Sequence, residues 1–214
     1  MIVMPANSTG IEFGRLCGRY PRSMGHLLSP GAARGPWPWL PYALDNGAFS
    51  AFTKGIPFDE QAFLAHCEWA LGTGPQPLWV VVPDVVADGA ATLAKWREWA
   101  PVLRRFGWPL AFAAQDGHQP GDVPADADVV FIGGSTEWKL QAIRPFCAAH
   151  RRVHVGRVNT YGRLRICADA GAESCDGTGW FRGDKTQLAG LLTFLGEEAG
   201  EIFRTKQSMI IGGA

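Results

Sequence analysis

Short apolar runs that end in a polar or glycine-bearing turn recur along the chain, and they constrain its fold more than any other feature. In LWVVVPD, the residues Leu78–Val82 are continuously apolar and lie between two prolines. A run of this kind is typical of a strand buried on both faces, as in a parallel sheet. Comparable runs end in YALD, AFAAQD, VVFIGG and ESCD. If these strands are parallel in one sheet, their terminal polar groups converge on one face.

Strand-like and helix-like segments alternate along the chain. The expected strands are Met1–Ala6, Gly25–Ser29, Tyr42–Asp45, Leu78–Val82, Pro109–Ala114, Asp128–Ile132, Arg152–Val158 and Glu173–Cys175. The expected helices are Thr9–Tyr20, Phe58–Leu71, Asp88–Phe106, Thr136–His150, Tyr161–Ala170 and one that contains Gln187–Leu195. Such alternation predicts an α/β fold with a parallel sheet. The number of strands predicts a compact (β/α)8 TIM-type barrel, formed by residues 1–214 as a single domain.

The chain has 214 residues, which is short for this barrel, so we expect some helices to be missing. Pro30–Pro41 marks one such place, because its proline, glycine and tryptophan residues predict a loop. Trp37 and Trp39 in this loop are expected to pack across the barrel mouth. The rival fold is an open doubly wound sheet. No G-x-G-x-x-G follows a predicted strand, so a dinucleotide site is not indicated.

The chain carries 20 basic and 20 acidic residues, so no overall field attracts it to nucleic acid or to a membrane. Six arginines nevertheless lie close together in sequence: Arg144, Arg151, Arg152, Arg157, Arg163 and Arg165. They form either a basic patch near the site or a set of solvated helix positions, and the sequence leaves both open. No apolar run reaches membrane-spanning length, and the N-terminus lacks the pattern of a secretory signal. We therefore expect a cytoplasmic protein without a membrane partner.

The cysteine and histidine residues do not form a metal-binding pattern. The five cysteines contain no C-x-x-C pair, and the five histidines are scattered. Only His118 and His154 lie near the ends of predicted strands, where a lone histidine is more often structural. We therefore expect no metal and no cofactor.

In a (β/α)8 barrel, the groups at the carboxyl ends of the strands form the active site. The candidates at those places are Asp45, Asp84, Gln115, Gly133, Gly134, Asn159 and Asp176. Two carboxylates that face one ligand suit chemistry at a sugar carbon, where one attacks and the other protonates the leaving group. A third carboxylate and a glutamine beside backbone N–H groups suit recognition of a flat polar base.

The order and context of these motifs resemble the queuine and archaeosine tRNA-guanine transglycosylases. They resemble still more closely the short phage-type versions that place 7-deazaguanines in DNA. DNGAF is similar to the family's D-S-G-G-F-Q motif, and ESCDG to the strand end that carries its nucleophilic aspartate. VVVPD, AFAAQDG and FIGGS are similar to the family's base-binding segments and follow in the same order. The resemblance extends from Asp45 to Trp180.

This resemblance implies roles for the site residues. Asp176 is implied as the nucleophile that attacks C1′ of a guanine nucleotide, and Asp45 as the general acid and base. Asp84 would accept the N1 and N2 protons of the base, while Gln115 and the Gly134 N–H would donate to its acceptor atoms. The other implied substrate contacts are Asn46, Gly47, Phe49, Gly133, Ser135, Gly156 and Asn159.

We therefore expect a guanine transglycosylase that exchanges guanine in DNA for a preQ0-like 7-deazaguanine, taken up as the free base. The reaction would pass through a covalent aspartyl–glycosyl intermediate. The family's C-x-C-x-x-C…H zinc segment is absent, which favours DNA over tRNA. A base in a duplex would have to be flipped out of the helix. Trp37, Trp39 or Trp180 could stack on it.

Three alternatives remain open at this point: a tRNA-guanine transglycosylase, a nucleoside hydrolase, and a nucleotide-binding barrel without activity. The presence of both Asp45 and Asp176 argues against the last of these, because binding alone needs no nucleophile. The sequence does not decide whether the chain forms a homodimer. If the protein is phage-encoded, the expected location is the cytoplasm of the bacterial host.

Overall fold

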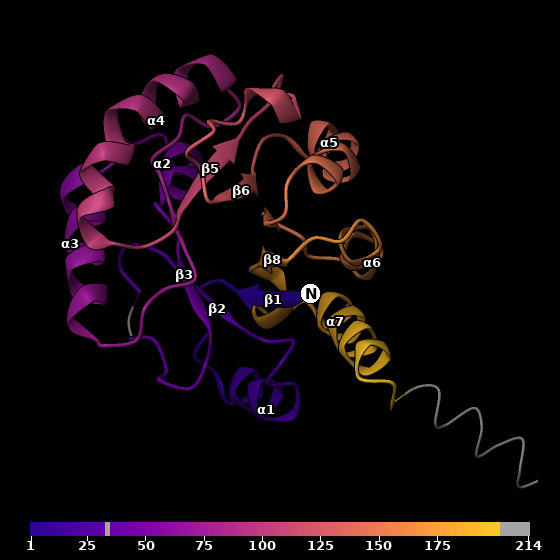
Figure 1. The fold of residues 1–214 in the computed structure, drawn as a ribbon. Helices are drawn as coiled ribbons and strands as arrows, with labels where there is room; N and C mark the ends of the chain where they lie inside the picture. Colours follow the sequence, from indigo (N-terminus) through magenta and orange to yellow (C-terminus); the bar gives the residue numbers. More distant parts are fainter. Residues whose placement is uncertain (33–34, 202–214) are drawn as a thin grey trace, which may run out of the picture.

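Eight parallel strands form a barrel with helices on its outside (Figure 1). The structure is a computed structural model and describes residues 1–32 and 35–201. The strands are β1 (Ile2–Pro5), β2 (His26–Leu28), β3 (Tyr42–Leu44), β4 (Val80–Val81), β5 (Leu110–Ala114), β6 (Val129–Ile132), β7 (Val153–Val155) and β8 (Ser174–Gly177). The predicted α/β barrel of the TIM type is thus confirmed.

The sheet order is β1-β8-β7-β6-β5-β4-β3-β2, and neighbouring strands are parallel throughout. Isolated bridges join the region of β1 to that of β2, so the barrel is nearly closed. Gly25 permits this approach, because a Cβ there would lie 2.9 Å from the Ile2 side chain and 3.0 Å from the Pro41 carbonyl oxygen. Closure places the carboxyl ends of all the strands around one mouth.

The helices cover the outer face of the barrel (Figure 1). They are α1 (Ile11–Arg19), α2 (Ala48–Lys54), α3 (Glu60–Gly72), α4 (Gly89–Leu103), α5 (Thr136–Ala149), α6 (Tyr161–Asp169) and α7 (Lys185–Glu198), with 3-10 turns at Arg104–Phe106, Pro120–Asp122 and Gly179–Phe181. Asp59, Asp88 and Asp184 accept first-turn N–H groups and cap α3, α4 and α7. Within the described ranges, none of these helices is long and apolar enough to span a membrane.

The expectation of missing helices is confirmed. Among the described residues, the connections from β2 to β3 and from β5 to β6 contain no α-helix. The first of these connections is the predicted loop Pro30–Pro41, of which residues 33–34 lie outside the described ranges. In contrast, two helices, α2 and α3, separate β3 from β4.

The sequence did not predict α2, only a turn at Asn46-Gly47. The turn is present, and the Asn46 side chain accepts the Ala48 N–H at 2.8 Å to start the helix. Ala48 is buried, whereas the other side chains of α2 are partly or fully exposed. Because α2 buries so little, its sequence AFSAFTK has no apolar stripe that could signal a helix.

Strand β7 is shorter than predicted. It ends at Val155, not at residue 158, because the chain turns at Gly156 and Arg157. Arg157 adopts a φ of 59°, in the left-handed region that residues with a side chain rarely occupy. This turn directs the Arg157 backbone N–H toward Asp176, so the early end of β7 belongs to the construction of the site.

The prediction that Trp37 and Trp39 pack across the barrel mouth is wrong. Trp37 packs against Phe13 of α1 and His26 of β2, at ring distances of 5.2 and 6.2 Å, and stacks on Trp39. Side chains alternate across a strand, and Leu27 belongs to the barrel interior, so His26 faces outward. The tryptophans of this loop therefore cover the outside of the barrel.

The core has two apolar layers. The larger one lies between the strands and the helices. The smaller one fills the barrel interior and consists of Met4, Leu27, Ala43, Trp79, Val81, Ala111, Ala113 and Val129. Trp79 is fully buried there, and the small alanine side chains leave room for its indole ring. The interior is thus closed by packing beneath the mouth, where the polar residues gather.

Candidate active site

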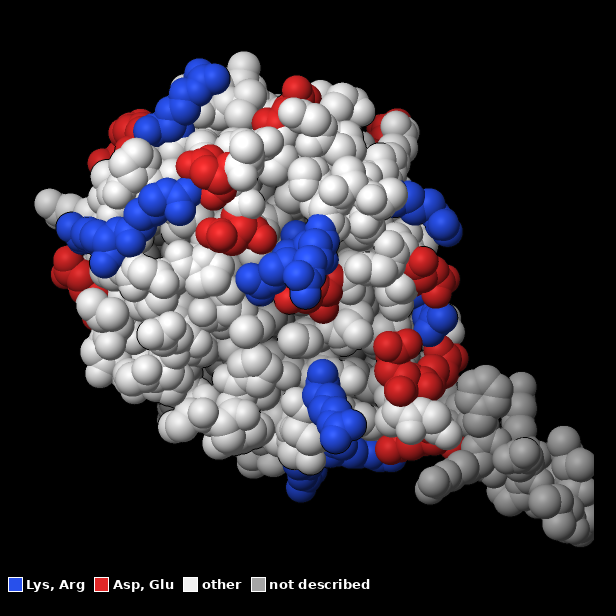
Figure 2. Space-filling model, in the orientation of Figure 1, with Lys and Arg blue, Asp and Glu red and all other residues white. Residues whose placement is uncertain are grey.

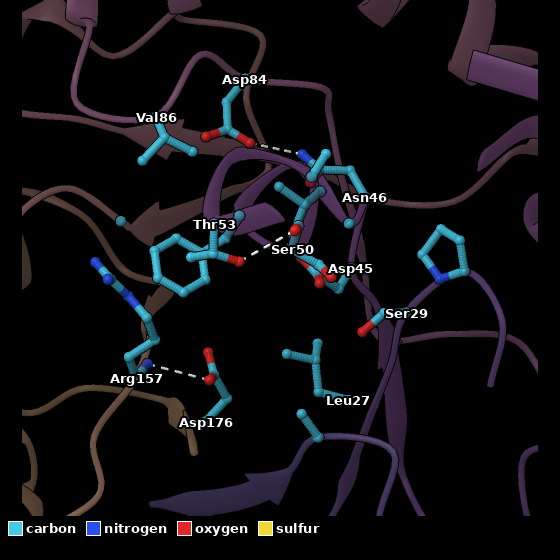
Figure 3. A pocket seen from close by; sticks show the side chains of 18 of the residues that line it. Leu27, Ser29, Asp45, Asn46, Ser50, Thr53, Asp84, Val86, Arg157 and Asp176 are labelled. Carbon is cyan, nitrogen blue, oxygen red and sulfur yellow. Dashed lines mark hydrogen bonds between the residues drawn. The ribbon is translucent and has the colours of Figure 1, made fainter. Parts of the chain in front are cut away.

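A cavity of about 730 Å³ opens at the carboxyl ends of the strands (Figure 3). Its size is typical of small-molecule sites. Among the expected site residues, the following line it: Asp45, Asn46, Gly47, Phe49, Asp84, Gln115, Gly133, Gly134, Gly156, Asn159 and Asp176. Ser135 does not line it. The barrel thus brings together residues from separate strand ends, as the sequence predicted.

Asp45 follows β3, and its side chain lines the same cavity as those of Asp84 and Asp176 (Figure 3). Burial raises the pKa of Asp45 to about 7, and the negative charges of Asp176 and Asp84 add to the rise. Hydrogen bonds from Ser29 and the Gly47 backbone act in the opposite direction. A carboxyl group with this pKa can hold a proton near neutral pH and donate it to a leaving group.

Asp84 follows β4 and is held by two side-chain amides. Asn46 Nδ2 donates to Asp84 Oδ1 at 2.7 Å, and Gln115 Nε2 donates to Asp84 Oδ2 at 2.8 Å. Burial raises the pKa of Asp84 to about 6, while the Asn46 hydrogen bond and the Arg157 charge act to lower it. Each carboxylate oxygen keeps a further acceptor site that a ligand N–H could use.

Gln115 follows β5 and connects Asp84 to the turn after β6. Its Oε1 accepts the backbone N–H groups of Ala87 and Gly134 at 3.0 and 2.9 Å. Gly134 has a φ of 63°, and a Cβ there would lie 2.6 Å from Asp116 Oδ2, so the turn requires glycine. The Gln115 amide and the Gly134 N–H were both expected to donate to a base. In this structure they take part in hydrogen bonds within the protein.

Asp176 lies in β8 with only 5% of its surface exposed, and both of its oxygens accept hydrogen bonds. His154 Nε2 lies 3.0 Å from Oδ2. The Arg157 backbone N–H donates to Oδ1 at 3.1 Å, as Figure 3 shows. His154 is itself fully buried, and its Nδ1 lies 2.8 Å from Ser174 Oγ. The carboxylate is therefore held in one orientation at the cavity wall.

The Arg157 side chain joins the two sides of the cavity. Its guanidinium donates to the Gly134 carbonyl and lies 4.1 Å from the centre of the Phe49 ring on α2. Burial lowers the pKa of Arg157, against the charges of Asp176 and Asp116, but an arginine remains charged. The Arg157 guanidinium is thus a cation held in place beside the carboxylates of the site.

Ser135 has a different role from the one that the resemblance implied. Its N–H donates to Asp116 at 2.7 Å, and its hydroxyl also donates to this carboxylate. The Ser135 oxygen accepts the Trp138 N–H and caps α5. Ser135 therefore fixes the start of a helix beside the cavity.

The six neighbouring arginines do not form one patch at the site. Arg157 lines the cavity, whereas Arg152 pairs with Glu173 at 3.0 Å and Arg165 pairs with Asp169 at 2.9 Å. Basic and acidic side chains are interspersed on the face seen in Figure 2. The other cations that line the cavity are Lys54 and Arg182, which the sequence analysis did not single out.

The sequence placed His154 near a strand end as a structural residue, but it did not connect His154 or Ser174 with Asp176. His154 and Ser174 alternate with buried apolar residues along β7 and β8, and that alternation was the available signal. Lys139 of α5 gave no signal. It is buried, donates to the Gly156 carbonyl, and has a pKa lowered to about 7 by burial. In the described part of the chain, no cluster of His, Cys, Asp and Glu is arranged to hold a metal ion.

No protein-family model and no curated protein matches this chain. Solved structures do match it. A 3-hexulose-6-phosphate synthase has a TM-score of 0.50 at 11% identity, covering 91% of this chain and 98% of its own. The Salmonella typhimurium 3-hexulose-6-phosphate synthase has a TM-score of 0.52 at 10% identity, covering 94% and 100%. A putative fructose-1,6-biphosphate aldolase from Coccidioides immitis has a TM-score of 0.56 at 11% identity, covering 98% and 92%. At such low identity, the likeness shows the fold alone.

Proposed function

We propose that this protein is an enzyme that exchanges guanine in DNA for a 7-deazaguanine base. The observation that carries this proposal is a pair of differently held carboxyl groups in one cavity. Asp45, with its pKa raised to about 7, suits a proton donor. Asp176, with a hydrogen bond on each oxygen, suits an oriented nucleophile. The motifs that resemble the transglycosylases assign the same two roles.

In the proposed reaction, an Asp176 oxygen attacks C1′ and the bond from C1′ to guanine N9 breaks. Asp45 gives its proton to the departing base, and the sugar remains bonded to Asp176 as an ester. The incoming 7-deazaguanine loses its N9 proton to Asp45. Its N9 then attacks C1′, and the ester bond breaks. Because each displacement inverts C1′, the product retains the original configuration.

The base would lie against Asp84 and the turn at Gly134. The Asp84 oxygens that Asn46 and Gln115 hold in place would accept the base N1 and N2 protons. For the Gly134 N–H to donate to the base carbonyl, that carbonyl must replace Gln115 Oε1 as its acceptor. The Phe49 ring, which now lies against the Arg157 guanidinium, offers an aromatic face at the same cavity.

The proposed function predicts that the protein incorporates labelled 7-deazaguanine into guanine-containing DNA with release of an equal amount of guanine. The assay compares DNA, unmodified tRNA and free guanine nucleosides at one low salt concentration. Exchange in tRNA alone would contradict the DNA assignment but leave the chemistry intact. Guanine release without incorporation would identify a hydrolase. No reaction with any of the three would refute the proposed function.

DNA binding measured at several salt concentrations tests how the polymer is held. Lys54 and Arg182 are exposed and line the cavity, so we expect each to neutralise a phosphate. Lys54→Gln and Arg182→Gln should each reduce the log–log salt slope of DNA binding by about 0.9 for a duplex, or about 0.7 for a single strand. Arg151→Gln is the matched control, because Arg151 is exposed and does not line the cavity. Equal slopes in all three variants would remove these two contacts from the proposal.

We expect kcat/KM to have a narrow bell-shaped dependence on pH, because this constant reports groups of the free enzyme. Asp45 must be protonated to act as an acid, so activity should fall as the pH rises above about 7. Asp84 must be ionised to accept the base protons, so activity should fall as the pH drops below about 6. Measurement of kcat/KM from about pH 5 to about pH 9 checks both limbs. A constant rate above pH 7 would remove Asp45 from the role of acid.

A further inference from the structure

A row of three buried polar side chains runs along the inside of the barrel from Ser174 through His154 to Asp176. Ser174 Oγ lies 2.8 Å from His154 Nδ1, and His154 Nε2 lies 3.0 Å from Asp176 Oδ2. The pairing of β7 with β8 sets this row, because His154 is in register with Ser174, two residues before Asp176. Neither the motifs nor the proposed chemistry assigns a role to His154.

Packing fixes the imidazole ring of His154 in place. The ring is fully buried, stacks on Phe131 at 4.8 Å with an interplanar angle of 25°, and meets the Trp79 ring edge-to-face at 4.7 Å. A 180° flip of the ring within this packing would put carbon atoms in place of both nitrogens and break both hydrogen bonds. The ring is therefore held with Nε2 facing Asp176.

The hydrogen-bond partners decide which nitrogen carries the proton. An ionised carboxylate can only accept, so Nε2 must donate to Asp176. The Ser174 hydroxyl can donate, so it can satisfy Nδ1 of a neutral ring. Both nitrogens are then satisfied without placing a positive charge between Trp79 and Phe131. Asp176 also keeps its full negative charge, which a nucleophile needs.

We propose that His154, held by Ser174 as the neutral Nε2–H tautomer, positions the Asp176 carboxylate for attack on the sugar. His154 holds Oδ2 from inside the barrel, and the Arg157 backbone N–H holds Oδ1 from the turn after β7. Lys139 supports this turn through the Gly156 carbonyl. The two donors together fix the direction in which the carboxylate points. This inference rests on the proposed function, in which Asp176 is the nucleophile.

The kinetic test compares two substitutions of His154. His154→Phe keeps an aromatic ring between Phe131 and Trp79 but has no donor. Formation of the covalent intermediate should slow by on the order of 10–10²-fold, the effect of a misplaced reacting group. KM should stay within about twofold, because His154 does not line the cavity and uniform binding is retained. His154→Gln restores an N–H near Nε2 and should recover most of the rate.

His26→Phe is the matched control. His26 is also buried and packs against aromatic rings, but it faces outward, and neither of its ring nitrogens has a hydrogen-bond partner in the described part of the chain. His26→Phe should keep the wild-type rate. A wild-type rate in His154→Phe would overturn the proposal. So would a loss in His154→Phe that His154→Gln does not recover, because it would indicate a packing effect.

Nitrogen-15 NMR of the imidazole tests the tautomer without any need for activity. The His154 signal, identified by its loss in His154→Phe, should be that of a neutral ring with the proton on Nε2. In Asp176→Asn, the Arg157 N–H still requires an oxygen, so the new amide N–H faces the ring, and the proton should move to Nδ1. An imidazolium in the wild type, or the same tautomer in both proteins, would overturn the proposal.

The two tests separate this inference from the proposed function. If the wild-type chain forms no covalent intermediate, the proposed function fails, and the NMR measurement still decides whether His154 holds Asp176 as described. If the wild-type chain forms the intermediate and the His154→Phe protein forms it at the same rate, the proposed function stands. The positioning role of His154 then fails.

Discussion

Replacement of Asp176 by asparagine should abolish covalent capture of the sugar and reduce base exchange by on the order of 10⁴–10⁶-fold, as loss of a catalytic nucleophile does. An amide oxygen is a poor nucleophile. The fold should persist, because asparagine has the same shape and can still accept the Arg157 N–H. The protein is incubated with labelled nucleic acid and run on a denaturing gel. A covalent sugar–protein adduct survives denaturation and appears as label in the protein band.

Asp126→Asn is the matched control for this substitution. Asp126→Asn also replaces a carboxylate by an amide, but at the outer surface of the protein. There, the Asp126 carboxylate accepts hydrogen bonds from Arg104 and from the Trp96 indole. It does not line the cavity, so adduct formation should equal that of the wild type. An Asp176→Asn protein that still forms the adduct would move the nucleophile to another residue, and Asp45 would be the first candidate.

Asp45→Asn should lower turnover by on the order of 10²–10⁴-fold, because an amide cannot donate the proton that the departing guanine needs. The substitution should be tolerated structurally, since an amide oxygen can still accept from Ser29 and the Gly47 backbone. It should also remove the alkaline limb of the pH profile. The measurement is single-turnover release of guanine, which isolates the first chemical step.

A substrate with a better leaving group separates acid catalysis from a structural effect of Asp45→Asn. N7-methylguanine carries a positive charge in the nucleotide and leaves as a neutral base without gaining a proton. The Asp45→Asn protein should therefore release N7-methylguanine at close to the wild-type rate. Equal losses with guanine and N7-methylguanine would show that Asp45 shapes the site but does not act as the acid.

Parts of the candidate site could be read from local sequence because one rule places them. Asp45, Asp84 and Asp176 each follow or end a short apolar run, and parallel strands in a closed sheet bring such ends to one mouth. This prediction needed only that the strands are parallel, and it did not depend on any particular side-chain contact. The same reasoning could not show that Ser135 turns away to cap α5, because that depends on its bonds to Asp116.

The arginines show where charge counting along the chain fails. Arg152 and Arg165 lie close to Arg157 in the sequence, which suggested a basic patch. However, the carboxylate of Glu173 just before β8, and carboxylates of α6 and α7, lie against them in the folded chain. Lys54 and Arg182 come from distant segments and lie at the cavity instead. Which cations face a ligand is thus a property of the packed helices and loops.

By itself, the sequence determined the barrel and the convergence of its strand ends, because continuous apolar runs and helical spacing are local patterns that burial imposes on each segment separately. Only the tertiary structure decided the environment of each carboxyl group. The rise in the pKa of Asp45 follows from its burial near Asp176 and Asp84, which come from other strands. The hold of His154 on Asp176 follows from the register of β7 against β8. Burial depth and strand register are set by contacts between distant segments, and no local pattern encodes them.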